Sequence, residues 1–385
     1  MTKTARSVAL LGTLAVSMIV VLALAGVVRV PGASRQAAGA PRTAWGDPDL
    51  QGIWSNNILV PLERAPAFGT RAFMTEAEHA TALAELLKQN ERPGRDSREG
   101  TGTEKDVARA YNEFWFGDKP TQLGMRTSMV IDPPDGRIPP FTSEAAARIA
   151  AKREFLAALL QGTSGGRPGP ISPRRTEPSP DYNLDRINRA DGPEDRGGPE
   201  RCFGNGLPVV MGTGTFGGVM QLVQSPDSVS IYYDIGQGQG FAWVIPIANR
   251  PHLPATVRLY RGDAIGRWQA DTLVVDVTNF SSETNFHGSR ENLHLVQRFT
   301  RTDPNTLSIE FTAEDPTTWT RPWTAVQELQ KSDDKTTLVL EGGCHEGNYG
   351  LLGMLINTRA AEKAFAEGRG PDPATQDNAT GGGAN

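Results

Sequence analysis

The sequence contains few of the residues that usually hold metals or act as nucleophiles. Two cysteines and five histidines are spread over 385 residues, which is too few for a protein with several metal ions. Acidic residues outnumber basic ones, 44 to 39, and the basic residues form no stripe of the kind that binds nucleic acid. We therefore expect neither a nucleic-acid partner nor a metal site.

Long apolar runs are also missing, with one exception at the N-terminus. An uncharged run lies between Arg6 and Arg29, and it is long enough to span a bilayer as a helix. The small residues Ala23 and Ala25 would equally suit signal-peptide cleavage. Basic residues before the run keep its start in the cytoplasm, so either alternative predicts an exported, periplasmic or extracellular body. Residues 1–40 are thus a predicted signal peptide or membrane anchor, and we expect membrane contact only through this segment if it is uncleaved.

Export determines how the two cysteines are interpreted. In an oxidising compartment, Cys202 and Cys344 most simply form one structural disulfide. Closing a loop of more than 100 residues would stabilise the fold by about 4–5 kcal/mol. A reactive thiol at Cys344, in "GGCHEGNYG", is the alternative.

The remaining chain is predicted to form a β-rich region with helices on either side of it in the sequence. Thr75 and Glu78 have the spacing of a capping box before one helix, and "TSEAAARIAAKREFLAALLQG" predicts a second helix. The predicted parts are an N-terminal loop and helix region (41–161), an irregular Gly/Pro/Arg-rich segment (162–200), an antiparallel β domain (201–348), a C-terminal helix (349–367) and a disordered tail (368–385).

The β domain is predicted from alternating apolar residues on both sides of turns. A turn about Gly238 would place Ile235 opposite Phe241 and Tyr233 opposite Trp243. A second hairpin, turning at "DPNT", matches Phe299 with Ile309 and Leu295 with Ala313. A third, turning at Asp333 and Asp334, would match Leu329 with Leu338 and Trp323 with Cys344. With the segments "ATVRLY" and "DTLVVDV", we expect nine or ten antiparallel strands in a barrel or sandwich.

The polar face of these hairpins supplies the first candidate site. The registers place Arg298 opposite Glu310 and His294 opposite Glu314. In a cavity, His294 with a glutamate partner could act as a general base; on a solvated sheet, the same residues would form weak surface ion pairs. Residues 279–292 form a connection longer than a hairpin needs, which favours a functional or disordered loop. The candidate ligand-binding residues are Glu283, Asn285 and His287 of this loop with Glu314 and Glu341 of the sheet.

The segment "CHEGNYG" supplies the second candidate site. Asn348 can cap the following helix, so His345 and Glu346 come just before a helix N-terminus, which favours anions and carboxylates. His345, Glu346 and His294 are therefore the candidate catalytic residues. The alternative is that Glu346 is only an N-terminal helix charge.

Several motifs together carry a resemblance. "RTSMVIDPPDGRIPP", "GRWQADTLVVDVTNF", "DPTTWTRPW" and "CHEGNYG" resemble an uncharacterised family of exported proteins from soil and environmental bacteria. The resemblance implies export and a single intact domain but no chemistry, and this chain departs from it in the Gly/Pro/Arg-rich stretch before "ERC". Gly52-Ile53-Trp54 is also similar to the G-x-W signature of lipocalins, which an antiparallel barrel would suit.

Our preferred hypothesis is an exported, lipocalin-like β-barrel that binds a small, largely apolar or aromatic molecule. One alternative is an extracytoplasmic lyase, isomerase or hydrolase that uses His345 or His294 with a glutamate partner. The other is a structural or envelope-interaction protein. The sequence leaves any cofactor and the oligomeric state open.

Overall fold

The computed structural model describes residues 41–90, 120–160, 192–193, 201–202, 206–212, 218–234, 240–339 and 344–371. The predicted leader (1–40), the tail beyond residue 371 and nearly all of 162–200 lie outside these ranges. All described residues belong to one compact unit, Ala38–Asn385. Within the described ranges, no helix combines the length and the apolar character that crossing a membrane requires.

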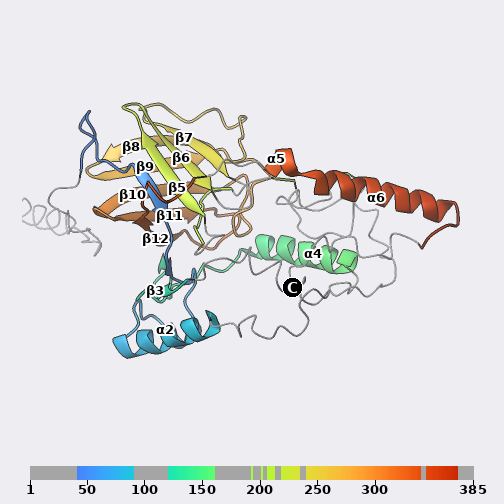
Figure 1. Ribbon diagram of the computed structural model, residues 1–385, viewed down its shortest axis with the longest axis horizontal. Coiled ribbons are helices and arrows are strands. Elements are labelled where there is room, and N and C mark those ends of the chain that lie inside the picture. The colour runs from blue at the N-terminus through green and yellow to red at the C-terminus, as the bar shows by residue number, and fades with distance from the viewer. Residues whose placement is uncertain are drawn as a thin grey trace, which may run out of the picture. The chain divides into compact units, whose positions relative to one another are not determined.

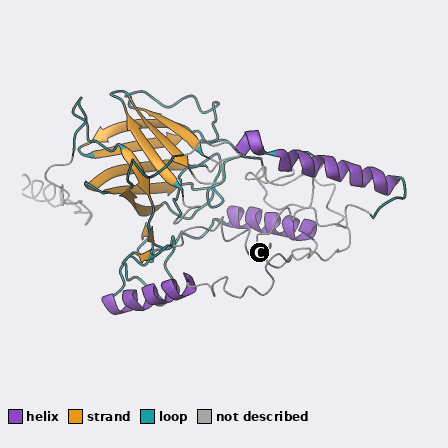
Figure 2. Ribbon diagram, in the orientation of Figure 1, coloured by secondary structure: helices purple, strands orange, loops and turns teal. Residues whose placement is uncertain are grey.

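The main feature of the described chain is one ten-stranded sheet (Figures 1 and 2). Its strands are β1 (Gly52–Ser55), β4 (Val130–Asp132), β5 (Val219–Gln224), β6 (Ser228–Asp234), β7 (Phe241–Pro246), β8 (Asp263–Gln269), β9 (Thr272–Thr278), β10 (His294–Asp303), β11 (Thr306–Glu314) and β12 (Trp323–Lys331). A separate two-stranded sheet joins β2 (Ile58–Leu59) to β3 (Gln122–Leu123). The prediction of an antiparallel β fold with helical flanks is confirmed.

The sheet curls into a nearly closed barrel of nine strands, with β4 paired to the side of β12. The neighbours run in the order β7-β6-β5-β1-β12-β11-β10-β9-β8, and every pair is antiparallel. An odd number of alternating strands makes the two end strands, β7 and β8, run in the same direction. The contact between them is accordingly a parallel bridge from Ile247 to Gly266, with the Ala248 amide donating to the Gly266 carbonyl at 3.2 Å. We call this junction the β7–β8 seam.

Alternation along each strand places one set of side chains inside the barrel. In β6, for example, Val229, Ile231 and Tyr233 are buried and the residues between them are not fully buried. Large aromatic residues from several strands, including Trp243 and Trp323, are buried with them. The barrel interior is therefore a packed core of apolar side chains.

The G-x-W segment forms β1, which lies between β5 and β12 and joins the two halves of the barrel. Trp54 is fully buried, and its indole N–H donates to the Leu50 carbonyl at 3.1 Å. The Arg301 guanidinium lies 5.5 Å from the centre of the Trp54 ring and donates to the Asp49 carbonyl at 3.0 Å. The N-terminal region thus contributes part of the barrel wall as well as helices.

The predicted helices are present. They are α2 (Glu76–Asn90), α4 (Ser143–Leu160), the short α5 (Cys344–Gly347) and α6 (Tyr349–Ala366), with a 3-10 turn, η1 (Pro66–Phe68). Thr75 and Glu78 exchange the hydrogen bonds of a capping box at the start of α2. The Asn348 side chain accepts from the Leu351 amide and caps α6.

The register of the second hairpin is confirmed in detail. Phe299 lies opposite Ile309, Arg298 opposite Glu310 and His294 opposite Glu314. The register of the first hairpin was wrong by two residues, since Tyr233 pairs with Phe241. A two-residue shift leaves every side chain on the same face, so alternation does not distinguish the two registers.

The third predicted hairpin was wrong. No strand follows β12 in residues 332–339, and Leu338 is 75% exposed. The free edge of β12 pairs instead with β1 and β4, so no returning strand is needed there. Cys344 lies in α5 and not opposite Trp323, which pairs with Ala313.

The predicted disulfide between Cys202 and Cys344 is present. It links residues 142 positions apart and joins the segment before β5 to α5. The Asn348 side-chain amide donates to the Cys202 sulfur at 3.2 Å. Cys344 is therefore a structural half-cystine, which removes the alternative of a reactive thiol and is consistent with an oxidising compartment.

Candidate functional site

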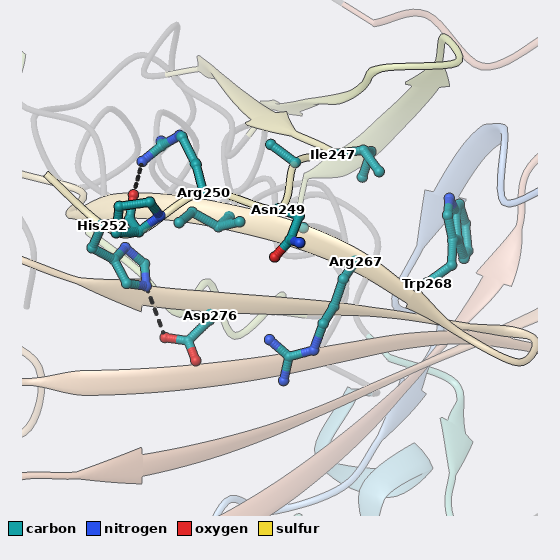
Figure 3. Close-up of a pocket in the computed structure, with 11 residues that line it drawn as sticks. Ile247, Asn249, Arg250, His252, Arg267, Trp268 and Asp276 are labelled. Carbon is teal, nitrogen blue, oxygen red and sulfur yellow. Dashed lines mark hydrogen bonds and ion pairs between the residues drawn. The ribbon is translucent and has the colours of Figure 1, made fainter.

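A surface pocket of about 540 Å³ lies at the β7–β8 seam. It is lined by the segment that follows β7 and by residues of β8 and β9, namely Ile247, Ala248, Asn249, Arg250, Pro251, His252, Ile265, Gly266, Arg267, Trp268 and Asp276 (Figure 3). Arg267 and Trp268 are consecutive and point to opposite faces of the strand. Both side chains reach the pocket because β8 is an end strand of the sheet. The pocket extends around the edge of β8 and so touches both of its faces.

Asp263 fastens the segment after β7 to the barrel. Its carboxylate is almost fully buried and accepts two hydrogen bonds from the Arg250 guanidinium, at 2.8 and 3.2 Å. The Leu253 amide and His252 Nδ1 each lie 2.9 Å from Asp263 Oδ2. Burial acts to raise the pKa of this carboxyl, but the hydrogen bonds outweigh it and lower the pKa to about 2. Asp263 is therefore ionised at neutral pH.

Asp276 brings two histidines together on the outer face of the barrel. Its Oδ1 atom lies 3.2 Å from His252 Nε2 and 3.1 Å from His294 Nε2, and the first of these contacts is drawn in Figure 3. His294 comes from β10, Asp276 from β9 and His252 from the segment after β7. Three separate parts of the chain thus meet at one carboxylate oxygen.

The two histidines differ in the hydrogen bonds that their ring nitrogens make. A neutral imidazole has one N–H and one lone pair. His252 contacts a carboxylate with each nitrogen, so both bonds form only when both nitrogens carry a proton. His294 contacts Asp276 through Nε2, whereas its Nδ1 lies 3.6 Å from Glu314 Oε2, beyond normal hydrogen-bond distance. His252 therefore bridges Asp263 and Asp276, whereas His294 lies between Asp276 and Glu314.

Arg267 is the free cation of the pocket. Its side chain is exposed and makes no hydrogen bond or ion pair with any residue in the described parts of the chain. Arg250, in contrast, is bound to Asp263. Arg298, two strands away on the same face, donates to Gln269 and lies 3.9 Å from Glu310. Among the pocket residues, Arg267 is therefore the guanidinium that no described carboxylate pairs with.

The 279–292 loop is held against the barrel and is not a disordered loop. Phe286 is buried, with its ring stacked on Trp323 at 5.7 Å and edge-on to Phe311 at 5.9 Å. Ser289 is also buried and donates to Asp315 at 2.6 Å. The loop is long because it fills this part of the barrel with apolar side chains.

The candidate ligand-binding residues of this loop make local contacts. The Asn285 side chain accepts from the Gly288 amide, and His287 packs edge-on against Phe286 and Trp323. Glu283 accepts from the Ser282 hydroxyl at 3.1 Å. None of the three lines the pocket at the seam.

The structure brings together some of the predicted site residues and not others. His294 and Glu314 meet as predicted. His345 is exposed in α5, and no contact within the described ranges joins its side chain to the 279–292 loop. Glu346 belongs to α5, and Glu341 lies outside the described residues. A shared site of His345 and the loop stays a prediction.

The sequence analysis missed His252, Asp263 and Asp276. His252 stands between two prolines in an irregular segment, and Asp276 interrupts the apolar run "TLVVDV". A carboxylate within such a run was the available signal, because burying a charge there requires partners. Nothing in the sequence pattern pairs it with His252.

The residues that meet here do not form an evident metal site. Within the described ranges, no three His, Cys, Asp or Glu side chains lie together in a way that could hold a metal ion. Comparison with known proteins adds no identification, since no family model and no curated protein matches the chain.

Proposed function

We propose that the protein binds a small molecule in the pocket at the β7–β8 seam, and not inside the barrel. Two observations support this location. The inward-facing positions are occupied by buried side chains such as Tyr233, Trp243 and Trp323. The pocket at the seam, at about 540 Å³, has the size of typical ligand sites, roughly 300–1,000 Å³.

The ligand we propose combines an anionic group with a flat or aliphatic body. Arg267 is the observation that carries this choice, because its guanidinium has no partner in the described structure and suits a carboxylate. Ile247, Ile265 and Trp268 supply apolar surface beside it. An organic carboxylate would use both features. We further propose that the mature protein is exported, which the Cys202–Cys344 disulfide supports.

Calorimetric titration with two probes of nearly equal shape tests this proposal. Benzoate carries the negative charge, and benzamide replaces it with a neutral amide. A charge-assisted hydrogen bond contributes about 1.5–3 kcal/mol, so we expect benzoate to bind at least about tenfold more tightly than benzamide. In Arg267→Gln this preference should disappear, while benzamide binding stays unchanged.

Arg321→Gln is the matched control. Arg321 is another exposed arginine, but it is paired with Asp132 at 2.8 Å and does not line the pocket. The control should bind benzoate like the wild type. Absence of benzoate binding at millimolar concentration, or equal benzoate binding by wild type and Arg267→Gln, would contradict the proposal.

A further inference from the structure

We propose that the pocket at the β7–β8 seam binds a hydroxylated organic acid, and that Asn249 recognises the hydroxyl group. This inference rests on the binding function proposed above, in which Arg267 holds the carboxylate of the ligand. It adds a second polar contact, which narrows the ligand class from organic carboxylates in general to those that also carry a hydroxyl group.

Three of the charged side chains that line the pocket are already held by other residues. Arg250 donates to Asp263 at 2.8 Å, and His252 lies between Asp263 and Asp276, with contacts of 2.9 and 3.2 Å. Asn249 differs from these residues, because its exposed side chain makes no hydrogen bond within the described parts of the chain. The amide of Asn249 is therefore available to a ligand.

The seam places Asn249 close to Arg267. A parallel bridge joins Ile247 to Gly266, so Asn249 comes two residues after the bridge in one segment and Arg267 one residue after it in the other. The Ala248 amide donates to the Gly266 carbonyl at 3.2 Å, which holds the two segments together. Both side chains line the pocket, and Figure 3 shows the Asn249 amide beside Arg267. A ligand whose carboxylate is bound by Arg267 therefore lies next to the amide of Asn249.

The amide of Asn249 is chemically suited to a hydroxyl group. Its Oδ1 atom accepts and its Nδ2 atom donates, and a hydroxyl group can likewise do both. The amide is uncharged, so it does not favour an ionic group. Trp268 does not compete for the hydroxyl, because its indole N–H is buried. A neutral hydrogen bond of this kind strengthens binding by about 2- to 12-fold.

Asp276 disfavours a second anionic group in the same pocket. It lies opposite Ile265, two residues along β8 from Arg267, which is roughly 7 Å along a strand. Both histidine contacts of Asp276 use Oδ1, and its Oδ2 atom has no partner within the described ranges. A carboxylate of the ligand would be repelled by this oxygen, whereas a hydroxyl group could donate to it. The pocket should therefore prefer a hydroxy acid to a dicarboxylic acid.

Calorimetric titration at neutral pH with four aromatic acids tests this preference. The probes are benzoate, 3-hydroxybenzoate, 4-hydroxybenzoate and terephthalate, which carries a second carboxylate at position 4. We expect at least one of the two hydroxybenzoates to bind about 2- to 12-fold more tightly than benzoate. Terephthalate should bind more weakly than benzoate. Tighter binding of terephthalate than of either hydroxybenzoate would contradict the proposed ligand class.

Asn249→Leu tests the assignment to Asn249. Leucine has a similar shape but neither donates nor accepts, so the ratio between the affinities for the preferred hydroxybenzoate and for benzoate should fall to about one. Asn357→Leu is the matched control, since Asn357 is exposed on α6 and does not line the pocket. This control should keep the wild-type ratio. Thermal unfolding of both variants shows whether a lost preference reflects a lost fold.

NMR of the asparagine side chains detects the contact itself. The Nδ2 resonances of Asn249 can be assigned by their absence from the spectrum of Asn249→Leu. They should move further when the preferred hydroxybenzoate binds than when benzoate binds. Equal movement with the two ligands would contradict a hydrogen bond between Asn249 and the hydroxyl group.

The outcomes distinguish this inference from the proposed function. If benzoate binds in an Arg267-dependent manner but neither hydroxybenzoate binds more tightly, the hydroxyl site is contradicted and the carboxylate site is retained. If the preference for a hydroxybenzoate persists in Asn249→Leu, the role of Asn249 is contradicted. If none of the four acids binds at millimolar concentration, both proposals are contradicted.

Discussion

His294 Nε2 lies 3.1 Å from Asp276 Oδ1, although the two residues are not direct partners in the sheet. Asp276 pairs with Val296, two residues along β10 from His294. Residues two apart on a strand share a face, so the contact is a diagonal one across the outer side of the barrel. The same carboxylate oxygen lies 3.2 Å from His252 Nε2. The contacts of Asp276 therefore depend on strand register as much as on residue identity.

Asp263 should make the stability of the protein depend on pH in the acidic range. Its pKa in the folded state is about 2, below the value near 3.9 expected for an unfolded chain. Its contribution is therefore complete above pH 4 and is lost as the pH falls towards 2. A shift of this size corresponds to about 2 kcal/mol. Denaturant unfolding at pH 6 and pH 3 should show a smaller loss of stability in Asp263→Asn than in the wild type.

Asp334→Asn is the control for this measurement. Asp334 is an exposed carboxylate that makes no hydrogen bond or ion pair within the described ranges. Its substitution should leave the pH dependence unchanged. An identical loss of stability between pH 6 and pH 3 in wild type and Asp263→Asn would show that the charge network at Asp263 does not stabilise the fold.

Substitution of either cysteine of the disulfide should destabilise the protein by the same amount. Cys202→Ser and Cys344→Ser each remove the same bond across 142 residues, for which the chain-entropy model gives about 4–5 kcal/mol. We expect the two variants to unfold at the same, lower denaturant concentration and the double variant to match them. Unequal single variants, or peptide mapping that finds both thiols free in exported protein, would contradict the assignment.

Phe286 should be one of the most important core residues although it lies in a loop. Phe286→Ala removes a buried ring that stacks on Trp323, and such truncations cost about 3–5 kcal/mol. Phe365→Ala, at a position in α6 that is 47% exposed, should cost less than about 0.5 kcal/mol. Similar denaturation midpoints for the two variants would show that the 279–292 loop does not close the barrel core.

The sequence predicted the β10–β11 hairpin correctly because both strands are long and their turn is short. Eight residue pairs, from His294–Glu314 to Arg301–Leu307, share one register, and only this register places all apolar residues on one face with so few turn residues. The hairpin after β12 was wrong for a different reason. The edge of β12 is covered by β1 and β4, which lie more than 190 residues earlier in the chain. Alternation within a local segment contains no information about such distant partners.

The site was only partly predictable for the same reason. His294 and Glu314 belong to one hairpin, so the predicted register of this hairpin already places them opposite each other. His252 reaches Asp276 through an irregular segment, whose path depends on the buried Asp263 and not on any periodic pattern. Local periodicity therefore identified His294 and Glu314, whereas His252, Asp263 and Asp276 join them only through tertiary contacts.

A crystal structure of the protein with benzoate tests the location of the ligand most directly. The account predicts density for benzoate at the β7–β8 seam, with its carboxylate within hydrogen-bond distance of the Arg267 guanidinium and its ring against Ile265 or Trp268. It also predicts that crystals of Arg267→Gln grown in the same solution lack this density. Benzoate inside the barrel, displacing side chains such as Trp243 and Trp323, would contradict the account.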